Sequence, residues 1–264
     1  MNITGKTRIL PIIGHPVSGV FSPPAFNLAF KDRGLDIVMV PMDIPSTSLR
    51  AFWNLLRNSA NMIGCSVTYP HKQATFDAMD DCTPRASRLR AVNTVRSEKG
   101  HLTGDATDGL AMCAAIDATG LTIENGAAHV IGAGGGAGIA IVDALCERGI
   151  SELTLSESNE NRAKSVKTLL AHFWPDVIVS NTTKPGAILI NATTLGKSPK
   201  DALPFDEHDI NCAALICDVV TLETPTRLCA FSEASGKATV SGQKMGQCQL
   251  DVQLEFLNCS GLAG

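Results

Sequence analysis

Aromatic residues are scarce in this chain of 264 residues, at 5% of the total with one tyrosine (Tyr69) and two tryptophans. A surface that stacks nucleic-acid bases, or that anchors a partner on Tyr and Trp, would have few side chains to use. Basic residues are also outnumbered, 22 against 26 acidic ones, which gives a net charge of −4. Because binding to nucleic acid requires a basic face, we expect no nucleic-acid partner.

Long hydrophobic runs are missing as well. No stretch approaches the roughly 18 apolar residues that a membrane helix needs, and the first ten residues do not resemble a signal peptide. The nine cysteines, an odd number spread from Cys65 to Cys259, form no C-x-x-C pair and no zinc-type spacing with histidine. We therefore expect a cytoplasmic protein with reduced, mostly buried thiols, no metal site and no membrane association.

The composition that is present, 44% hydrophobic and 18% charged, is typical of a globular protein. Its length corresponds to about two domains. In the first part, apolar runs alternate with helix-compatible spacing. They predict strands at 7–13, 37–42, 62–68 and 92–96, helices at 23–33, 46–57 and from 72 onward, and a hairpin around 98–100. This is a βαβαβ region in a parallel or mixed sheet.

The second part of the chain reads as a nucleotide-binding unit. A helix over 108–119 leads into it, and a helix over 245–257 follows it. Strands are predicted at 127–131, 153–156, 177–180, 187–191, 214–219 and 237–240, and helices after the glycine-rich segment and over 163–173. The predicted division places 1–107 and 241–264 in one domain and 108–240 in the other.

The glycine-rich segment GAGGGAG over 132–138 follows an apolar run directly. The spacing Gly132-x-Gly134-x-x-Ala137 at a strand-to-helix junction is typical of a dinucleotide-binding loop, with the pyrophosphate at the helix N-terminus. The small third residue allows close packing between helix and strand. A longer loop that ends in Gly138 also fits, so the register stays open. The predicted cofactor contacts here are Gly132, Gly134, Gly135, Gly136 and Ala137.

An acidic residue is expected at the end of the following strand, where it would bind the ribose hydroxyls of NAD. Glu157 stands at that position. Its carboxylate would repel the 2′-phosphate of NADP, and the nearest arginine, Arg162, lies in the following helix. Either NAD or NADP remains possible as cofactor, and Glu157 favours NAD.

Several other segments together resemble the shikimate dehydrogenase family, which also includes quinate dehydrogenases. The segment SVTYPHK over 66–72 resembles that family's N-V-T-x-P-x-K motif. The segment AVNTV over 91–95 is identical to the family's A-V-N-T-V segment. GDATDG over 104–109 is similar to G-x-N-T-D-G, and NATTLG over 191–196 to N-A-T-P-L-G. GQKM over 242–245, followed by Gln249, resembles its terminal helix. These matches span nearly the whole chain in the family order.

This resemblance implies an N-terminal α/β substrate domain with a mainly parallel sheet and a C-terminal Rossmann-type domain. It implies reversible hydride transfer between a nicotinamide and a ring hydroxyl of shikimate, 3-dehydroshikimate or a close cyclic hydroxy-acid. Lys72 and Asp108 would form the catalytic pair, since oxidation of an alcohol requires a base for the hydroxyl proton. The implied substrate contacts are Ser22, Thr68, Asn93, Gln249 and Thr221. The further implied cofactor contacts are Asn191, Thr193 and Gly242.

The chain departs from the family pattern around the substrate. In the first substrate loop, where the family has H-S-x-S-P with two serines that grip the substrate carboxylate, only Ser22 matches and Val20 replaces the other serine. Ser66 and Ala106 each replace an asparagine, and Thr221 stands where a tyrosine is expected. The loss of these polar groups predicts retained chemistry with an altered substrate.

Three functions therefore stay open. The first is a shikimate dehydrogenase, and the second is a quinate dehydrogenase or a paralogue with another polyol-acid substrate. The third is a non-catalytic dinucleotide-binding protein, which the presence of both Lys72 and Asp108 disfavours. In each case we expect a monomer or a homodimer.

Overall fold

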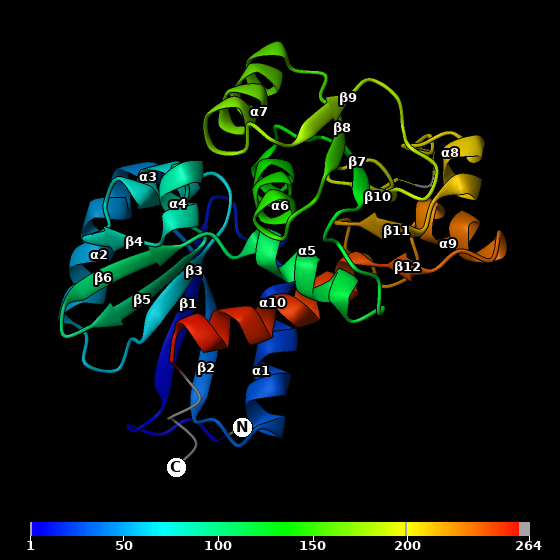
Figure 1. The fold of residues 1–264 in the computed structure, drawn as a ribbon. Coiled ribbons are helices and arrows are strands. Elements are labelled where there is room, and N and C mark those ends of the chain that lie inside the picture. The colour runs from blue at the N-terminus through cyan, green and yellow to red at the C-terminus, as the bar shows by residue number, and fades with distance from the viewer. Residues whose placement is uncertain (1, 199, 259–264) are drawn as a thin grey trace. The chain divides into compact units, whose positions relative to one another are not determined.

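The computed structural model describes residues 2–198 and 200–258, and its contacts divide the chain into two compact units (Figure 1). Unit 1 comprises Met1–Thr107 and Leu250–Gly264, and unit 2 comprises Asp108–Gln249. Within the described ranges, no helix is both long and apolar enough to cross a membrane.

Unit 1 is built on a mixed sheet of six strands in the order β2-β1-β3-β5-β6-β4. Its strands are β1 (Arg8–Gly14), β2 (Ile37–Asp43), β3 (Gly64–Val67), β4 (Asp81–Cys82), β5 (Thr94–Glu98) and β6 (His101–Asp105). Its helices are α1 (Ser22–Asp32), the 3₁₀ turn η1 (Ser46–Ser48), α2 (Leu49–Asn58), α3 (Lys72–Phe76) and α4 (Pro84–Leu89). Strands β2, β1 and β3 pair in parallel, whereas β5 is antiparallel to β3 and β6.

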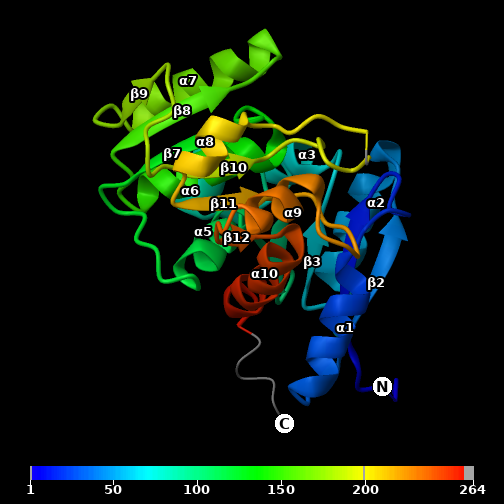
Figure 2. The same ribbon diagram turned by 90° about the vertical axis from the view of Figure 1, so that its right-hand side faces the viewer.

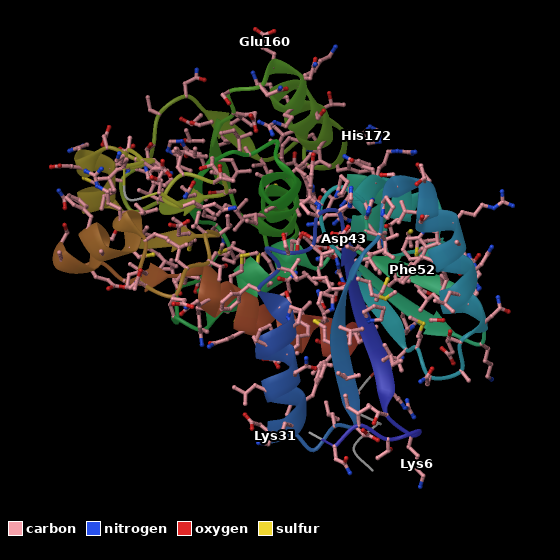
Figure 3. The ribbon with its side chains drawn as sticks, turned by 180° about the vertical axis from the view of Figure 1, so that it is seen from behind. Lys6, Lys31, Asp43, Phe52, Glu160 and His172 are labelled. Atoms are coloured by element: carbon pink, nitrogen blue, oxygen red, sulfur yellow. The ribbon has the colours of Figure 1, made fainter. Side chains whose placement is uncertain are left out.

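Both faces of this sheet are covered. Alternate residues of β1 point to opposite sides, as the pleat of a strand requires: Leu10 joins a cluster that includes Phe30, and Ile13 joins a cluster that includes Leu56. Helix α2 supplies Leu49, Phe52, Trp53 and Leu56 to the second cluster. The opposite cluster receives apolar side chains from α1 and from the end of the last helix. Figure 3 shows Phe52, which α2 contributes, from behind.

Unit 2 is built on a fully parallel sheet in the order β12-β11-β10-β7-β8-β9. Its strands are β7 (Ala127–Ile131), β8 (Glu152–Ser156), β9 (Ile178–Ser180), β10 (Ile188–Asn191), β11 (Leu215–Asp218) and β12 (Thr239–Val240). Its helices are α5 (Asp108–Asp117), α6 (Gly136–Glu147), α7 (Glu160–Phe173), α8 (Glu207–Cys212), α9 (Arg227–Ala234) and the first part of α10 (Gly242–Phe256). The strand order reverses between β7 and β10, as in a doubly wound Rossmann fold.

Helices cover both faces of the parallel sheet, and its strands are accordingly apolar on both sides. One face packs on α5 and α6 through residues such as Met112 and Ile141. The other face packs on α8 and α9 through Ile210 and Leu228. Figure 2 shows α8 and α9 in yellow and orange beside β10 and β11. The predicted fold class is thereby confirmed, with an N-terminal α/β unit followed by a Rossmann-type unit.

The two units divide a single helix between them. In α10, Met245 packs in the core of unit 2, whereas Leu250 and Leu254 in its second half, and Leu257 just after it, pack in unit 1. The contact boundary accordingly falls at Leu250, inside the helix, and not at the predicted residue 241. The physical reason is that a continuous helix can present successive turns to different neighbours.

Among the described residues no disulfide joins two cysteines, and five of the eight described thiols are buried. Burial raises the pKa of Cys113 to about 12 and also raises that of Cys217, since a thiolate is disfavoured away from water. Cys259 lies outside the described residues. The prediction of reduced, mostly buried thiols therefore holds for the eight that are described.

We expect Leu56→Ala to lower the free energy of unfolding by about 2–5 kcal/mol, because the side chain is 0% exposed and its removal leaves a cavity. Leu55→Ala in the same helix, where the side chain is 50% exposed, serves as the matched control and should change it by less than about 0.5 kcal/mol. Urea unfolding followed by circular dichroism would measure both. Equal losses for the two variants would contradict the assignment of the core face of α2.

Candidate functional site

Hydrogen bonds to neighbouring segments of unit 1 hold the turn that carries Lys72. It follows β3, and Thr68 donates its backbone N–H to Ile13 of the neighbouring strand at 2.9 Å. His71, which is buried, contacts the carbonyl oxygen of Ile44 through Nε2 at 2.6 Å. The carbonyl of Lys72 accepts the N–H of Val92 at 2.9 Å. The partly buried Lys72 thus begins α3 at a fixed place beside the segment that leads to Asn93.

Asn93 is buried and holds the end of unit 1 in position. Its Oδ1 accepts the backbone N–H of Thr107 at 2.7 Å and the Thr107 hydroxyl at 3.1 Å. Its own backbone N–H donates to Asp105, and its carbonyl accepts from Val67. Asn93 therefore connects the end of β3 with the residue that precedes Asp108 in the chain.

The first loop, over 15–21, matches the family pattern less closely. Ser22 begins α1, is partly buried, and makes no hydrogen bond through its hydroxyl to another described residue. Val20 packs against the apolar cluster of α1, which fits a valine better than a serine. Ser66, where the family has asparagine, donates its hydroxyl to Gln253 Oε1 at 2.8 Å, and both residues are buried.

Asp108 and Gln249 meet in unit 2, although 141 positions separate them. Gln249 Nε2 donates to Asp108 Oδ1 at 2.7 Å. Asp108 lies in the first turn of α5, where the positive end of the helix dipole stabilises a carboxylate. The next residue, Gly109, packs directly on the carbonyl of Ala140 in α6, where a Cβ atom would lie 2.0 Å from that oxygen. Close packing of α5 on α6 therefore fixes the position of the carboxylate.

The glycine loop joins β7 to α6 in the register that the sequence left open. Gly132 has a φ of +78°, and a Cβ on Gly138 would lie 2.0 Å from the Gly132 carbonyl oxygen. Gly138, and not Ala137, is therefore the small residue that permits close packing. A Cβ on Gly134 would meet the carbonyl of Arg162 at 2.5 Å, so the second glycine accommodates the start of α7.

The start of α6 fits a pyrophosphate. Gly136, the first residue of the helix, has nothing within 4 Å of where its Cβ would be, so a ligand can approach the first helical turn. The first N–H groups of a helix have no partner within it and bind anions. The residues present therefore fit the diphosphate of a dinucleotide. Among the described residues, no cluster of three or more His, Cys, Asp and Glu could hold a metal ion.

Glu157 follows β8 and turns toward the glycine loop. Its Oε2 accepts the N–H of Gly134 at 3.2 Å, and its Oε1 accepts the N–H of Asn159 and contacts Arg162 at 3.0 Å. The backbone N–H of Asn159, Arg162 and the N–H of Gly134 lower the pKa of Glu157 although burial opposes them. The carboxylate is therefore charged at neutral pH, directly beside the second glycine.

A buried carboxylate that the sequence analysis did not single out lies at the end of β11. Asp218 accepts hydrogen bonds from Asn191 Nδ2 at 2.9 Å, the Thr226 hydroxyl at 2.6 Å and the N–H of Val220 at 3.0 Å. Burial raises its pKa, and these hydrogen bonds oppose the rise. Asp218 thus joins the ends of β10 and β11. The signal that could have found it is an acidic residue closing an otherwise apolar strand, LICD.

The remaining predicted cofactor residues lie at the end of β10, in the turn after it, or against the loop after β11. Asn191 also accepts the N–H and hydroxyl of Thr193 through Oδ1, at 3.1 and 2.7 Å, which shapes the turn after β10. Gly242 begins α10 against the loop after β11, where a Cβ would lie 2.7 Å from the hydroxyl oxygen of Thr221. Asn191, Thr193 and Gly242 therefore contact the loops of unit 2. Their contact with a cofactor stays a prediction.

Comparison with known proteins agrees with this arrangement. A family model described as the shikimate dehydrogenase substrate binding domain matches residues 12–95. The shikimate dehydrogenase (NADP(+)) of Rubrobacter xylanophilus is 34% identical over 92% of this chain and 88% of its own length.

Two solved structures share the fold. The shikimate 5-dehydrogenase of Thermus thermophilus, in complex with NADP(H) and shikimate, has a TM-score of 0.80 at 25% identity, covering 95% of this chain and 93% of that one. The ligand-free 5-ketofructose reductase of a Gluconobacter species has a TM-score of 0.88 at 23% identity, covering 96% and 94%. The second likeness concerns the fold alone.

We expect Gly138→Ala to destabilise unit 2 and to abolish dinucleotide binding, because its Cβ cannot fit against the Gly132 carbonyl. Gly136→Ala, two residues earlier in the same helix, is the matched control, since it meets no atom within 4 Å and replaces glycine with a better helix former. Thermal unfolding without cofactor would measure the stability of both variants, and only Gly138→Ala should have a lower melting temperature than the wild-type chain. A Gly138→Ala variant as stable as Gly136→Ala would contradict the longer register of the loop.

Proposed function

This chain belongs to the shikimate dehydrogenase family, and we propose that it is an NAD(P)-dependent oxidoreductase. It would transfer hydride reversibly between the nicotinamide and the carbon that bears a ring hydroxyl of shikimate or a close cyclic hydroxy-acid. The observation that carries the proposal is the 2.7 Å hydrogen bond between Asp108 and Gln249. It joins two residues, remote in sequence, to which the family resemblance independently assigns substrate chemistry.

Lys72 would take the proton of the substrate hydroxyl as the hydride leaves the adjacent carbon. Asp108 would orient the Lys72 amine and share its proton, and Gln249 would hold the Asp108 carboxylate in place while reaching the substrate. A bound nicotinamide supplies the hydride acceptor. In the reverse direction Lys72 would return the proton to the carbonyl oxygen, so that one group serves as base and as acid.

Thr68 and Asn93 would position the ring, since both lie next to the fastened turn of Lys72. Ser22 and Thr221 would add hydroxyl groups from the loops after β1 and β11. Holding the reacting carbon and the amine at a fixed separation lowers the entropic cost of reaction. The cytoplasmic location, and the state as monomer or homodimer, stay predictions of the sequence.

The preferred cofactor is proposed to be NAD. The charged Glu157 carboxylate beside Gly134 would accept hydrogen bonds from the ribose hydroxyls and would repel a 2′-phosphate. The relative from Rubrobacter xylanophilus carries NADP(+) in its name. Arg162 contacts Oε1 of Glu157 at 3.0 Å, whereas Oε2 accepts the N–H of Gly134 in the glycine loop.

A second candidate is a paralogue that acts on quinate or another cyclic polyol-acid. The observation that favours it is Val20, which replaces a serine of the family pattern and packs in the apolar cluster of α1. Replacing a hydroxyl that binds an anion costs about 1.5–3 kcal/mol of affinity. A non-catalytic dinucleotide-binding protein would have no use for both Lys72 and Asp108.

An initial-rate panel of shikimate, quinate and their relatives against NAD and NADP tests the function directly. We expect at least one of these acids to be turned over. Lys72→Ala should lower kcat by about 100- to 10,000-fold, because the proton acceptor is lost, while cofactor binding measured by fluorescence titration persists. Lys99→Ala, in the β5–β6 turn, should leave kcat unchanged. Full activity of Lys72→Ala would refute the catalytic assignment, and no turnover by the wild-type chain would favour the non-catalytic candidate.

We expect the wild-type chain to have a higher kcat/KM with NAD than with NADP. Glu157→Gln keeps the shape of the side chain but removes its charge, and should raise the NADP-to-NAD ratio of kcat/KM about tenfold. Glu160→Gln, exposed in the first turn of α7, is the control and should leave the ratio unchanged. Faster turnover with NADP by the wild-type chain would show that our interpretation of Glu157 is wrong.

A further inference from the structure

Three adjacent parallel strands of unit 1 end at the same level. Gly14 at the end of β1 pairs with Asp43 at the end of β2, and Ile13 pairs with Val67 at the end of β3. The next residues along the chain are His15 after β1 and Thr68 after β3. Ligands of parallel sheets bind at this carboxyl edge. His15 therefore stands between Asp43 and the turn that carries Lys72.

The backbone places His15 close to that turn. Its N–H donates to the carbonyl oxygen of Tyr69 at 3.1 Å, three residues before Lys72. The preceding Gly14 approaches the same turn so closely that a Cβ would lie 2.5 Å from the Thr68 methyl group and 3.0 Å from the Tyr69 carbonyl oxygen. The site of His15 is thus fixed relative to the proposed proton acceptor within the same unit.

Asp43 holds the imidazole of His15 in one orientation. His15 Nδ1 lies 2.5 Å from Asp43 Oδ1, and the other oxygen of Asp43 accepts the N–H of Val17 at 3.3 Å. The hydrogen bond from His15 lowers the pKa of Asp43, so the carboxylate is charged at neutral pH and Nδ1 carries the hydrogen. Figure 3 shows the labelled Asp43 at the end of β2.

The opposite nitrogen of His15 remains available. No described residue binds Nε2, and the side chain is 53% exposed. The other histidine of this region, His71, is buried and engaged by Ile44, so it serves to hold the turn of Lys72. Of the two histidines, His15 is the one that a substrate can reach.

The charge of this pair indicates which substrate group it binds. The charged Asp43 carboxylate lies directly against the imidazole, and this negative charge disfavours the carboxylate of a hydroxy-acid. A hydroxyl group fits, because it can donate to Nε2 of the neutral ring or accept from Nε2–H of the protonated ring. In the same loop Val20 replaces a serine of the family pattern, so one hydroxyl group that could bind the substrate carboxylate is missing.

We propose that His15 is a substrate-binding residue whose Nε2 forms a hydrogen bond with a ring hydroxyl, and that Asp43 is the positioning residue that orients it. This inference rests on the proposed function. It names His15 as a determinant of specificity among polyol substrates that is separate from the catalytic pair.

The test uses the full chain with the best substrate of the initial-rate panel and a set of analogues that each lack one ring hydroxyl. His15→Phe should lower kcat/KM for the full substrate about 10- to 100-fold, mainly through KM. It should leave the affinity for the nicotinamide cofactor within about twofold, because only the substrate loses a contact. The wild-type chain should discriminate against the analogue that lacks the bound hydroxyl, and His15→Phe should lose that discrimination at one hydroxyl only.

Matched variants separate binding from folding. His101→Phe removes a histidine that is also 53% exposed and also bound to an aspartate, Asp81, and should behave as wild type. His15→Gln keeps a hydrogen-bonding group and should retain part of the discrimination, and it replaces His15→Phe if that variant fails to fold. Asp43→Asn should weaken discrimination for the same hydroxyl.

The outcomes distinguish this inference from the proposed function. Turnover by the wild-type chain together with unchanged KM and unchanged discrimination in both His15 variants would overturn the role of His15 and leave the dehydrogenase intact. Absence of turnover with every acid and both cofactors would overturn both. A uniform loss across all analogues and the cofactor would also reject substrate contact by His15, because it would indicate a structural role.

Discussion

Parallel pairing of strands is the constraint on which the functional arrangement depends. Strands that run in the same direction bring their carboxyl ends to one edge, and the chain must leave each strand there through a turn. In unit 1 this gathers Asp43, His15 and the turn of Lys72. In unit 2 it gathers the glycine loop, Glu157 and Asp218 at the ends of β7, β8 and β11. Strand pairing alone therefore brings segments that are distant in sequence next to one another.

Each of these edges is then organised by a carboxylate that accepts several hydrogen bonds. Asp43 secures the loop after β1, Glu157 secures the glycine loop against α7, and Asp218 secures the turns after β10 and β11. The side chains of Glu157 and Asp218 are buried, and a buried carboxylate needs such partners because an unpaired charge is costly away from water. The loops that hold the proposed site residues are thereby ordered by polar contacts, while the apolar clusters beneath them provide stability.

The sequence predicted the elements that carry strong apolar periodicity, including α2, β7, β10 and α10, and the glycine loop between β7 and α6. Its motifs also indicated Asp108 and Gln249 before their hydrogen bond was known. The short helices α4, α8 and α9 escaped prediction because six to eight residues give little periodicity. Their capping residues Thr83, Asp206 and Thr226 were the available signal. The sequence could not predict the register of the glycine loop or the partners of His15. Both depend on contacts between residues that are distant in sequence, which no local sequence pattern indicates.

Helix α10 has a consequence for the order in which this protein can fold. Its first turns complete the apolar core of unit 2 through Met245, and its last turns complete that of unit 1 through Leu250 and Leu254. Both cores therefore stay incomplete until this helix is available, even though most of unit 1 precedes it in the chain. Until that segment is available, the apolar face that β1 and β2 share with α1 lacks the side chains of Leu250 and Leu254 and stays partly exposed.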